Sequence, residues 1–251
     1  MLPKQFIPAH NYDLIRIGSK RDGGYLVERQ SIKNSKTLIG LGLNDNWIFE
    51  KEVIARYQIP VIGFDCVLST KYLIQKAVTG FLALYKFYKT ERFCAFAKNL
   101  YRIFDYQKYR NIFHQKFIGY PLGADHLSLT QLFEQYVRDT PVFLKCDIEG
   151  WEYRILNEII AHANSLSGLV IEFHDIDLHK DRIISFIESL PLTVVHIHPN
   201  NCGPVDGSHD PVTIELTFAK DPAPINDLPC LLPHKLDCPN TAEFPDIKIV
   251  T

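Results

Sequence analysis

Short apolar runs rich in β-branched residues recur along this chain, and segments with helical spacing of apolar residues separate them. This alternation predicts parallel strands joined by crossover helices, because such strands are covered by helices on both faces. The fold class is therefore α/β, with a mostly parallel seven-stranded sheet. We expect strands at 37–43, 61–66, 116–123, 142–149, 169–174, 193–199 and 212–218, and helices at 46–57, 127–138, 151–163 and 179–189.

The last two expected strands, 193–199 and 212–218, are separated by a turn-rich segment that has no room for a crossover helix. A parallel connection needs such a crossover, whereas an antiparallel one needs only a turn. We therefore expect a C-terminal antiparallel hairpin at the end of the sheet.

A chain of 251 residues with 46% hydrophobic residues can bury one large core, so we expect a single domain over residues 1–251. The segment 67–115 is too long for a structureless loop and should contain two or more helices. It is aromatic, and from Val67 to Lys116 there are ten Lys or Arg against two acids. The tail 221–251 is rich in proline and should form an irregular strap over the domain.

Charge and cysteine usage narrow the class of protein. The net charge of −2 gives no electrostatic reason to expect a nucleic-acid partner. The six cysteines are scattered without a C-x-x-C pair, which favours reduced thiols in a cytoplasmic protein. The N-terminus lacks a leader, and the apolar runs are far shorter than the roughly 20 residues of a membrane span. We expect a protein that is neither exported nor integral to a membrane.

The first expected strand runs into Gly40-Leu41-Gly42 and then into a helix. Glycines at the carboxyl end of a parallel strand let the backbone approach a bound cofactor closely, although a plain strand-to-helix turn has the same residues. The next strand ends at Asp65, a carboxylate placed to accept hydrogen bonds from ribose hydroxyls or to cap a turn.

The segment FLKCDIEGWEYRIL (143–156) is the most informative. Strand alternation places Asp147 and Glu149 on one face, at the tip of an apolar central strand. Two carboxylates there need a ligand amine, a metal ion or backbone amides to offset burial. For Glu149, capping of the following helix is the structural alternative.

This segment resembles the signature of the FkbM family of methyltransferases, in which a lysine precedes an aspartate, an apolar residue, Glu-Gly and a second glutamate. RIGSKRDGGYLV (16–27) resembles a segment that lies ahead of the first strand in one branch of that family. LGLNDNWIFE (41–50), VIGFD, VIEFH and HIHPNNC are similar to its cofactor loop, its second strand and its late strands.

The resemblance implies a Rossmann-like methyltransferase fold and O-methylation of sugar or glycan-type hydroxyls, with S-adenosylmethionine as donor. The first glycine loop departs from the usual pattern, because Ile39 replaces an acid and Asn44 replaces the third glycine. The residues expected to bind the cofactor are Asp22, Gly23, Gly24, Tyr25, Gly40, Gly42, Leu43, Asp65, Asp147 and Glu149.

Histidines supply the remaining chemistry. We expect Asp147, His174 and His198 to meet at the rim of the sheet as the catalytic residues. A histidine there suits general-base work on an acceptor hydroxyl at neutral pH. The same three residues are also candidate ligands for a divalent metal ion that activates the hydroxyl. Backbone pairing of these histidines is the structural alternative. Glu172, Asn200 and Asn201 are the candidate acceptor-binding residues, although Asn is also a common turn residue.

The expected partner is a small-molecule or glycan acceptor, and the sequence does not fix the oligomeric state. The basic, aromatic insertion 67–115 has three interpretations: a helical lid packed on the domain, a pocket for an anionic or nucleotide-linked acceptor, and a peripheral contact with an anionic membrane near lipid-linked glycans. Two other functions are compatible with the sequence: a metal-dependent hydrolase or lyase, and a non-catalytic glycan-binding relative.

Overall fold

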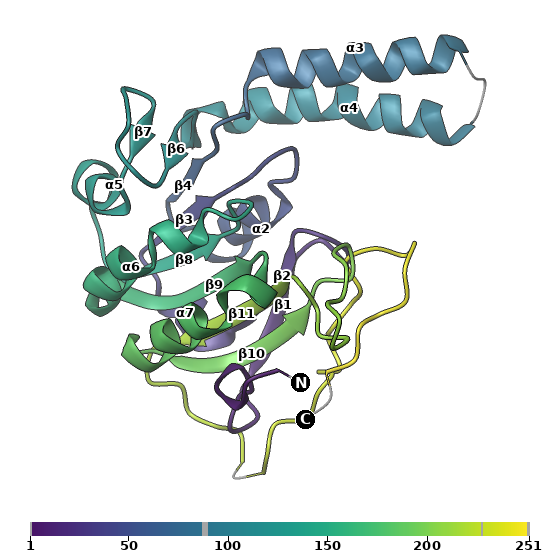
Figure 1. Ribbon diagram of the computed structural model, residues 1–251. Coiled ribbons are helices and arrows are strands. Elements are labelled where there is room, and N and C mark those ends of the chain that lie inside the picture. The colour runs from purple at the N-terminus through teal and green to yellow at the C-terminus, as the bar shows by residue number, and fades with distance from the viewer. Residues whose placement is uncertain (1, 87–89, 227, 250–251) are drawn as a thin grey trace.

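The computed structural model describes residues 2–86, 90–226 and 228–249, with side chains outside 83–92. A seven-stranded sheet runs through the centre of the molecule (Figure 1). β11 is antiparallel to both of its neighbours, and the other adjacent pairs are parallel. The expected fold class is confirmed. In spatial order the strands are β10 (Thr193–Pro199), β11 (Ile214–Ala219), β9 (Leu166–Phe173), β8 (Val142–Cys146), β3 (Thr37–Leu41), β4 (Val61–Phe64) and β5 (Phe113–His114).

Helices cover both faces of the sheet, because its central strands are buried along their whole length. One face packs against α5 (Leu129–Tyr136), α6 (Leu156–His162) and α7 (Ile176–Ser189). The other packs against α1 (Arg29–Asn34) and α2 (Ile48–Tyr57). Short 3-10 turns lie at Lys4–Phe6, Arg110–Ile112, Glu152–Arg154 and Ala163–Ser165.

Two features of the sheet differ from expectation. The edge strand beside β4 is β5 and not 116–123, where only β6 (Phe117–Ile118) forms and pairs with β7 (His126–Leu127). An antiparallel hairpin of β1 (Leu14–Gly18) and β2 (Gly24–Glu28) also precedes the sheet. β2 contacts β11, β10 and β9, so this hairpin covers part of the sheet face.

The insertion after β4 forms two helices, as expected. α3 (Thr70–Lys86) and α4 (Thr90–Tyr109) lie side by side and project beyond the α/β body (Figure 1). Among the described residues, the pair packs on the body at its base, in a cluster with Leu43 and Trp47. The expected lid is therefore wrong for the outer part, where Phe81 and Phe93 are exposed. Phe104 lies nearer the base and is exposed as well. Of the insertion's other aromatics, Phe87 and Tyr88 lie outside the described residues, as does the side chain of Tyr85.

The C-terminal strap follows the surface without a helix or a strand in its described residues, 221–226 and 228–249. It is tied to the domain at Asn240, whose carbonyl accepts a hydrogen bond from the Asp22 amide and whose side chain donates to Glu215. Asp237 also lies 2.9 Å from the ring of His196. Among the described residues, no helix has both the length and the apolar content of a membrane span.

Candidate functional site

A cavity of about 430 Å³ opens where β3, β4 and β8 end. This volume lies within the roughly 300–1,000 Å³ of small-molecule and cofactor sites, and the carboxyl ends of parallel strands are where such sheets bind ligands. Asn44, Phe64, Lys116, Phe117 and Trp151 contribute to its wall. Of the residues predicted from the sequence, Asp22, Gly23, Gly42, Leu43, Asp65, Asp147 and Glu149 line this one cavity.

The first glycine loop is shaped by its contact with β8. Gly42 has φ of +75°, and a Cβ built there would lie 1.5 Å from the carbonyl oxygen of Asp147. Gly40 does not belong to the cavity wall. A Cβ at Gly40 would instead meet the buried carboxylate of Glu50 at 2.7 Å, so this glycine makes room for a side chain of α2.

We expect Gly42→Ala to destabilise the protein by about 2–4 kcal/mol, because it adds both backbone strain and a clash with β8. Thermal unfolding measures the loss. Gly207→Ala is the matched control, since nothing lies within 4 Å of a Cβ at that position. An unchanged melting temperature for Gly42→Ala would show that β3 and β8 are less closely apposed than described.

Asp65 at the end of β4 is already engaged by the backbone. One carboxylate oxygen accepts hydrogen bonds from the amides of Leu43 and Asn44, and the other from the amides of Val67 and Leu68. A carboxylate offers about four lone-pair sites, so these four donors saturate it. Asp65 therefore fixes both loops that border the cavity, and a ribose could bind it only by displacing one of these amides.

At the tip of β8, Asp147 is surrounded by polar groups from distant segments. The hydroxyl of Tyr25 donates hydrogen bonds to Asp147 at 3.0 Å and to Glu172 at 3.3 Å. Tyr25 does not line the cavity, so it contacts the site from beneath. Lys145 is buried, donates to the carbonyl of Gly42 at 2.6 Å and lies 3.9 Å from Asp147. Burial raises the pKa of Asp147 to about 6, opposed by the charges of Lys145 and His174.

Glu149 and His174 complete this end of the site. Glu149 has φ of +54°, a left-handed conformation that is rare for residues other than glycine. Its carboxylate lies 3.5 Å from Nε2 of His174, while Nδ1 of His174 lies 3.2 Å from the buried Glu152. Burial lowers the pKa of His174, but Glu152 outweighs it, so the net shift is upward.

Asp147, Glu149 and His174 are arranged as a candidate metal site. One ligand atom from each lies within 4.8 Å of the others. Glu152 also accepts hydrogen bonds from the amides of Ile148 and Gly150, which holds the loop that carries Glu149. A carboxylate that orients the second nitrogen of a histidine is typical of metal-binding histidines.

The expected cluster of Asp147, His174 and His198 is not formed. β11 lies between β9 and β10, so His198 is two strands away from the end of β9. There it is buried, with Nδ1 3.4 Å from Glu215. The expectation failed because strand periodicity gives the face of a residue but not the lateral order of its strand. Glu149 takes the place predicted for His198.

The candidate acceptor-binding residues are also used internally. Asn200 is buried and donates to Glu172 at 2.7 Å. Asn201 is buried and holds the strap by donating to the carbonyls of Thr241 and Phe244. Neither asparagine nor Glu172 lines the cavity. Burial, reinforced by the nearby Asp147, raises the pKa of Glu172 well above its ordinary value. The predicted acceptor-binding role of these three residues is therefore not supported.

Three buried charged residues at or beneath the site were not among the predicted site residues: Lys145, Glu152 and Glu50. The first two lie inside the motif around Asp147, where a charged residue in a buried strand and a second glutamate were visible signals. Glu50 had no such signal, because it falls among the ordinary polar positions of α2. Its burial beneath Gly40 depends on the packing of α2 against the sheet.

Comparisons with known proteins add little to this geometry. No family model and no curated protein matches the chain. A solved structure described as an RNA methyltransferase from Pyrococcus horikoshii is 10% identical, with a TM-score of 0.36, and the match covers 76% of this chain and 77% of that one. Another, described as a sarcosine dimethylglycine methyltransferase from Galdieria sulphuraria, is 8% identical, with a TM-score of 0.39 and coverage of 76% and 80%. The functional assignment therefore depends on this chain's own residues.

Proposed function

We propose that the chain is an S-adenosylmethionine-dependent O-methyltransferase that acts on a hydroxyl of a sugar, glycan or related polyhydroxylated small molecule. One observation carries the proposal: the Gly42 turn, Asp65, Asp147 and Glu149 meet in a single cavity at the carboxyl ends of β3, β4 and β8. The resemblance to FkbM-type methyltransferases lies in these same segments.

The cavity wall is chemically suited to such a nucleoside. Apolar groups of Phe64, Val67 and Ile118 offer contacts for a base, and the backbone approaches closely at Gly42. The exposed carboxylate of Glu149 is available for a ligand amine, since 78% of its side chain is exposed. When bound, S-adenosylmethionine supplies an electrophilic methyl group on a cationic sulfur.

The protein's own contribution is proton removal and positioning. Asp147 lines the cavity, and a carboxyl group with a pKa near 6 is mostly ionised at neutral pH, which suits a general base. His174 has a raised pKa and lies between Glu149 and Glu152, so we assign it to holding the Glu149 loop. Trp151 contributes an aromatic group to the cavity wall, and its ring is held there by the guanidinium of Arg154 at 4.3 Å.

Calorimetry and turnover test the proposal. We expect the purified protein to bind S-adenosylmethionine and to transfer a labelled methyl group from it to an oxygen of a hydroxylated acceptor. Binding of a divalent metal ion without the nucleoside would favour the hydrolase or lyase alternative. Binding of neither, together with binding of glycans, would favour the non-catalytic alternative.

A metal-assisted version of the same reaction has one specific observation in its favour, the grouping of Asp147, Glu149 and His174. In that version a divalent ion lowers the pKa of the acceptor hydroxyl. Calorimetry with Mg²⁺ or Mn²⁺ should then show binding that Glu149→Gln weakens. Full activity after exhaustive chelation would exclude this version while leaving Asp147 as the base.

The pKa of Asp147 gives a prediction on pH. Activity that requires the carboxylate should rise with pH and level off above about 6.

Stability should change in the opposite sense. The native state holds the proton of Asp147 more tightly than the unfolded state does. The stabilisation that the protonated carboxyl gives to the native state is therefore lost as pH rises from about 4 to 6. We expect Asp147→Asn to remove that part of the pH dependence in thermal unfolding, and an unaltered dependence would contradict the shifted pKa.

A further inference from the structure

The side of the α3–α4 pair that is turned away from the body exposes large apolar side chains that no other part of the described structure covers. On α3, Ile74, Val78, Phe81 and Leu82 are between 46% and 59% exposed. Their spacing of i, i+4, i+7 and i+8 places them in one stripe along the helix. A continuous apolar stripe on a projecting helix is informative, whereas single exposed apolar residues are common.

A matching stripe runs along α4. Phe93, Leu100 and Phe104 recur at intervals of seven and four residues. Their side chains are 64%, 39% and 75% exposed, in that order. The rings of Phe81 and Phe96 meet across the two helices, with centroids 5.6 Å apart. The stripes therefore border one another along the pair.

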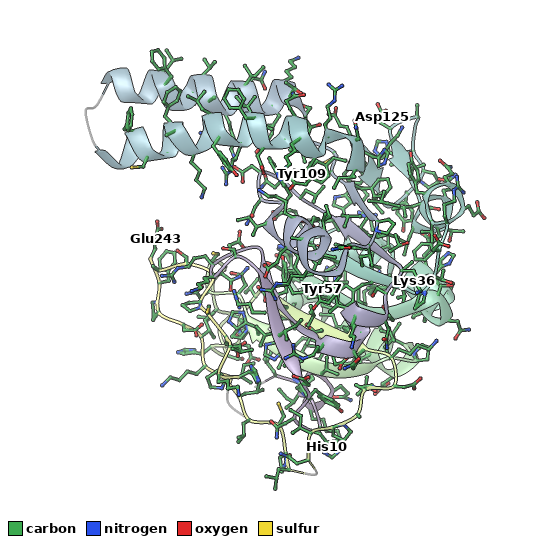
Figure 2. The ribbon with its side chains drawn as sticks, turned by 180° about the vertical axis from the view of Figure 1, so that it is seen from behind. His10, Lys36, Tyr57, Tyr109, Asp125 and Glu243 are labelled. Atoms are coloured by element: carbon green, nitrogen blue, oxygen red, sulfur yellow. The ribbon has the colours of Figure 1, made fainter. Side chains whose placement is uncertain are left out.

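The opposite side of the pair faces the body. Lys76 of α3 and Arg102 of α4 both bind the carboxylate of Asp45. On each helix this cation lies about half a turn from the middle of the apolar stripe, as the helical spacing of 100° per residue requires. Figure 2 shows the two helices reaching out from the body, with Tyr109 labelled where α4 meets it. The apolar stripes are thus turned away from the contact with Asp45.

The charge of this region is positive. Residues 67–116 carry ten Lys or Arg and two acids. One of the acids, Asp105, is bound by Lys51 of the body. By the same helical spacing Lys71 and Lys108 lie beside the apolar stripes; both are exposed, and neither has a carboxylate partner among the described residues. Long lysine side chains beside an apolar stripe can extend their ammonium groups toward anionic headgroups.

We propose that this apolar face of the α3–α4 pair, defined by Ile74, Val78, Phe81, Leu82, Phe93, Leu100 and Phe104, binds the surface of an anionic lipid bilayer. Apolar side chains bordered by cations match a layer of negative headgroups over acyl chains. A second copy of the chain fits less well, because it would bring the same excess of cations to the interface and like charges repel.

This face lies opposite the side of the pair that borders the cavity. Tyr72 on the first turns of α3 lines the cavity and donates to Asn44, and Asp45 in the cavity wall is the anchor of the helix pair. A bilayer bound to the apolar face would therefore be separated from the cavity by the helix pair.

Vesicle co-sedimentation of the full chain tests the lipid contact without cofactor or acceptor. We expect binding to phosphatidylcholine vesicles that contain phosphatidylglycerol, weaker binding at high ionic strength, and little binding to phosphatidylcholine alone. Phe104→Ser should weaken binding roughly tenfold or more, from the lost burial of one aromatic side chain. Replacement of Lys71 and Lys108 by Gln should weaken it by more than tenfold, at roughly fivefold for each charge.

The body offers matched controls. Leu178 is 74% exposed on α7, so Leu178→Ser should leave vesicle binding unchanged, as should Lys33→Gln on α1. Failure of the unaltered protein to bind anionic vesicles would overturn the proposal. So would a concentration-dependent dimer that Phe104→Ser dissociates while vesicle binding is absent, because the face would then join two copies of the chain.

The two proposals can fail separately. Vesicle binding by a protein that does not bind S-adenosylmethionine would retain the lipid contact and reject the methyltransferase. Methyl transfer to free sugars at equal rates with and without anionic vesicles, by a protein that does not bind those vesicles, would retain the methyltransferase and reject the lipid contact.

Discussion

Asp147→Asn should lower kcat for methyl transfer by about 10²–10⁴-fold, the range lost when a positioned general base is removed. The substitution keeps the size of the side chain and its hydrogen bond from Tyr25, so the fold should persist. It removes a cavity carboxylate whose pKa is raised to about 6. Initial rates at saturating donor and acceptor measure the loss, and calorimetry should show binding of the nucleoside within a few-fold of the unaltered protein.

Glu149→Gln is the matched comparison, because it removes a second cavity carboxylate two residues away. In the general-base mechanism it should affect nucleoside affinity more than kcat. If Asp147→Asn retains most of kcat, Asp147 is not the base. If both variants lose kcat equally and lose metal binding with it, the metal-assisted version becomes the better account.

Lys145→Met should destabilise the protein by roughly 3–5 kcal/mol, because removing one member of a buried charge cluster leaves the others uncompensated. Lys145 is 3% exposed, and burial alone would lower its pKa, yet the nearby Glu50, Asp147 and Glu172 raise it. In a chain of this size such a loss lowers the melting temperature by on the order of 10 °C. Thermal and urea unfolding measure it.

A second substitution separates charge from packing. Glu50 is fully buried, so Glu50→Gln combined with Lys145→Met should recover part of the stability lost by Lys145→Met alone. Lys36→Met is the surface control, since this lysine is exposed at the start of β3 (Figure 2) and should change stability by no more than about 0.5 kcal/mol. If the double variant is no more stable than Lys145→Met alone, Glu50 does not interact electrostatically with Lys145.

Much of the fold was predictable from the order of apolar segments. The strand at 193–199 was predicted with the bounds of β10, and the next one pairs with it antiparallel, as the short linker required. The edge strand was misplaced, because β5 has only two residues and so gives no periodic signal. The β1–β2 hairpin was not among the predicted strands, although its Asp-Gly-Gly-Tyr segment carries part of the family resemblance.

The sequence by itself determined that the glycine turn and the acids at 65, 147 and 149 lie at strand ends, because a parallel sheet brings such ends to one edge. Only the tertiary structure decided which groups touch there. Asp65 is occupied by backbone amides, and His198 is held apart by β11. The physical reason is that periodicity fixes the direction of a side chain along its own element. Lateral strand order, and hydrogen bonds between residues far apart in the chain, depend on how the elements pack.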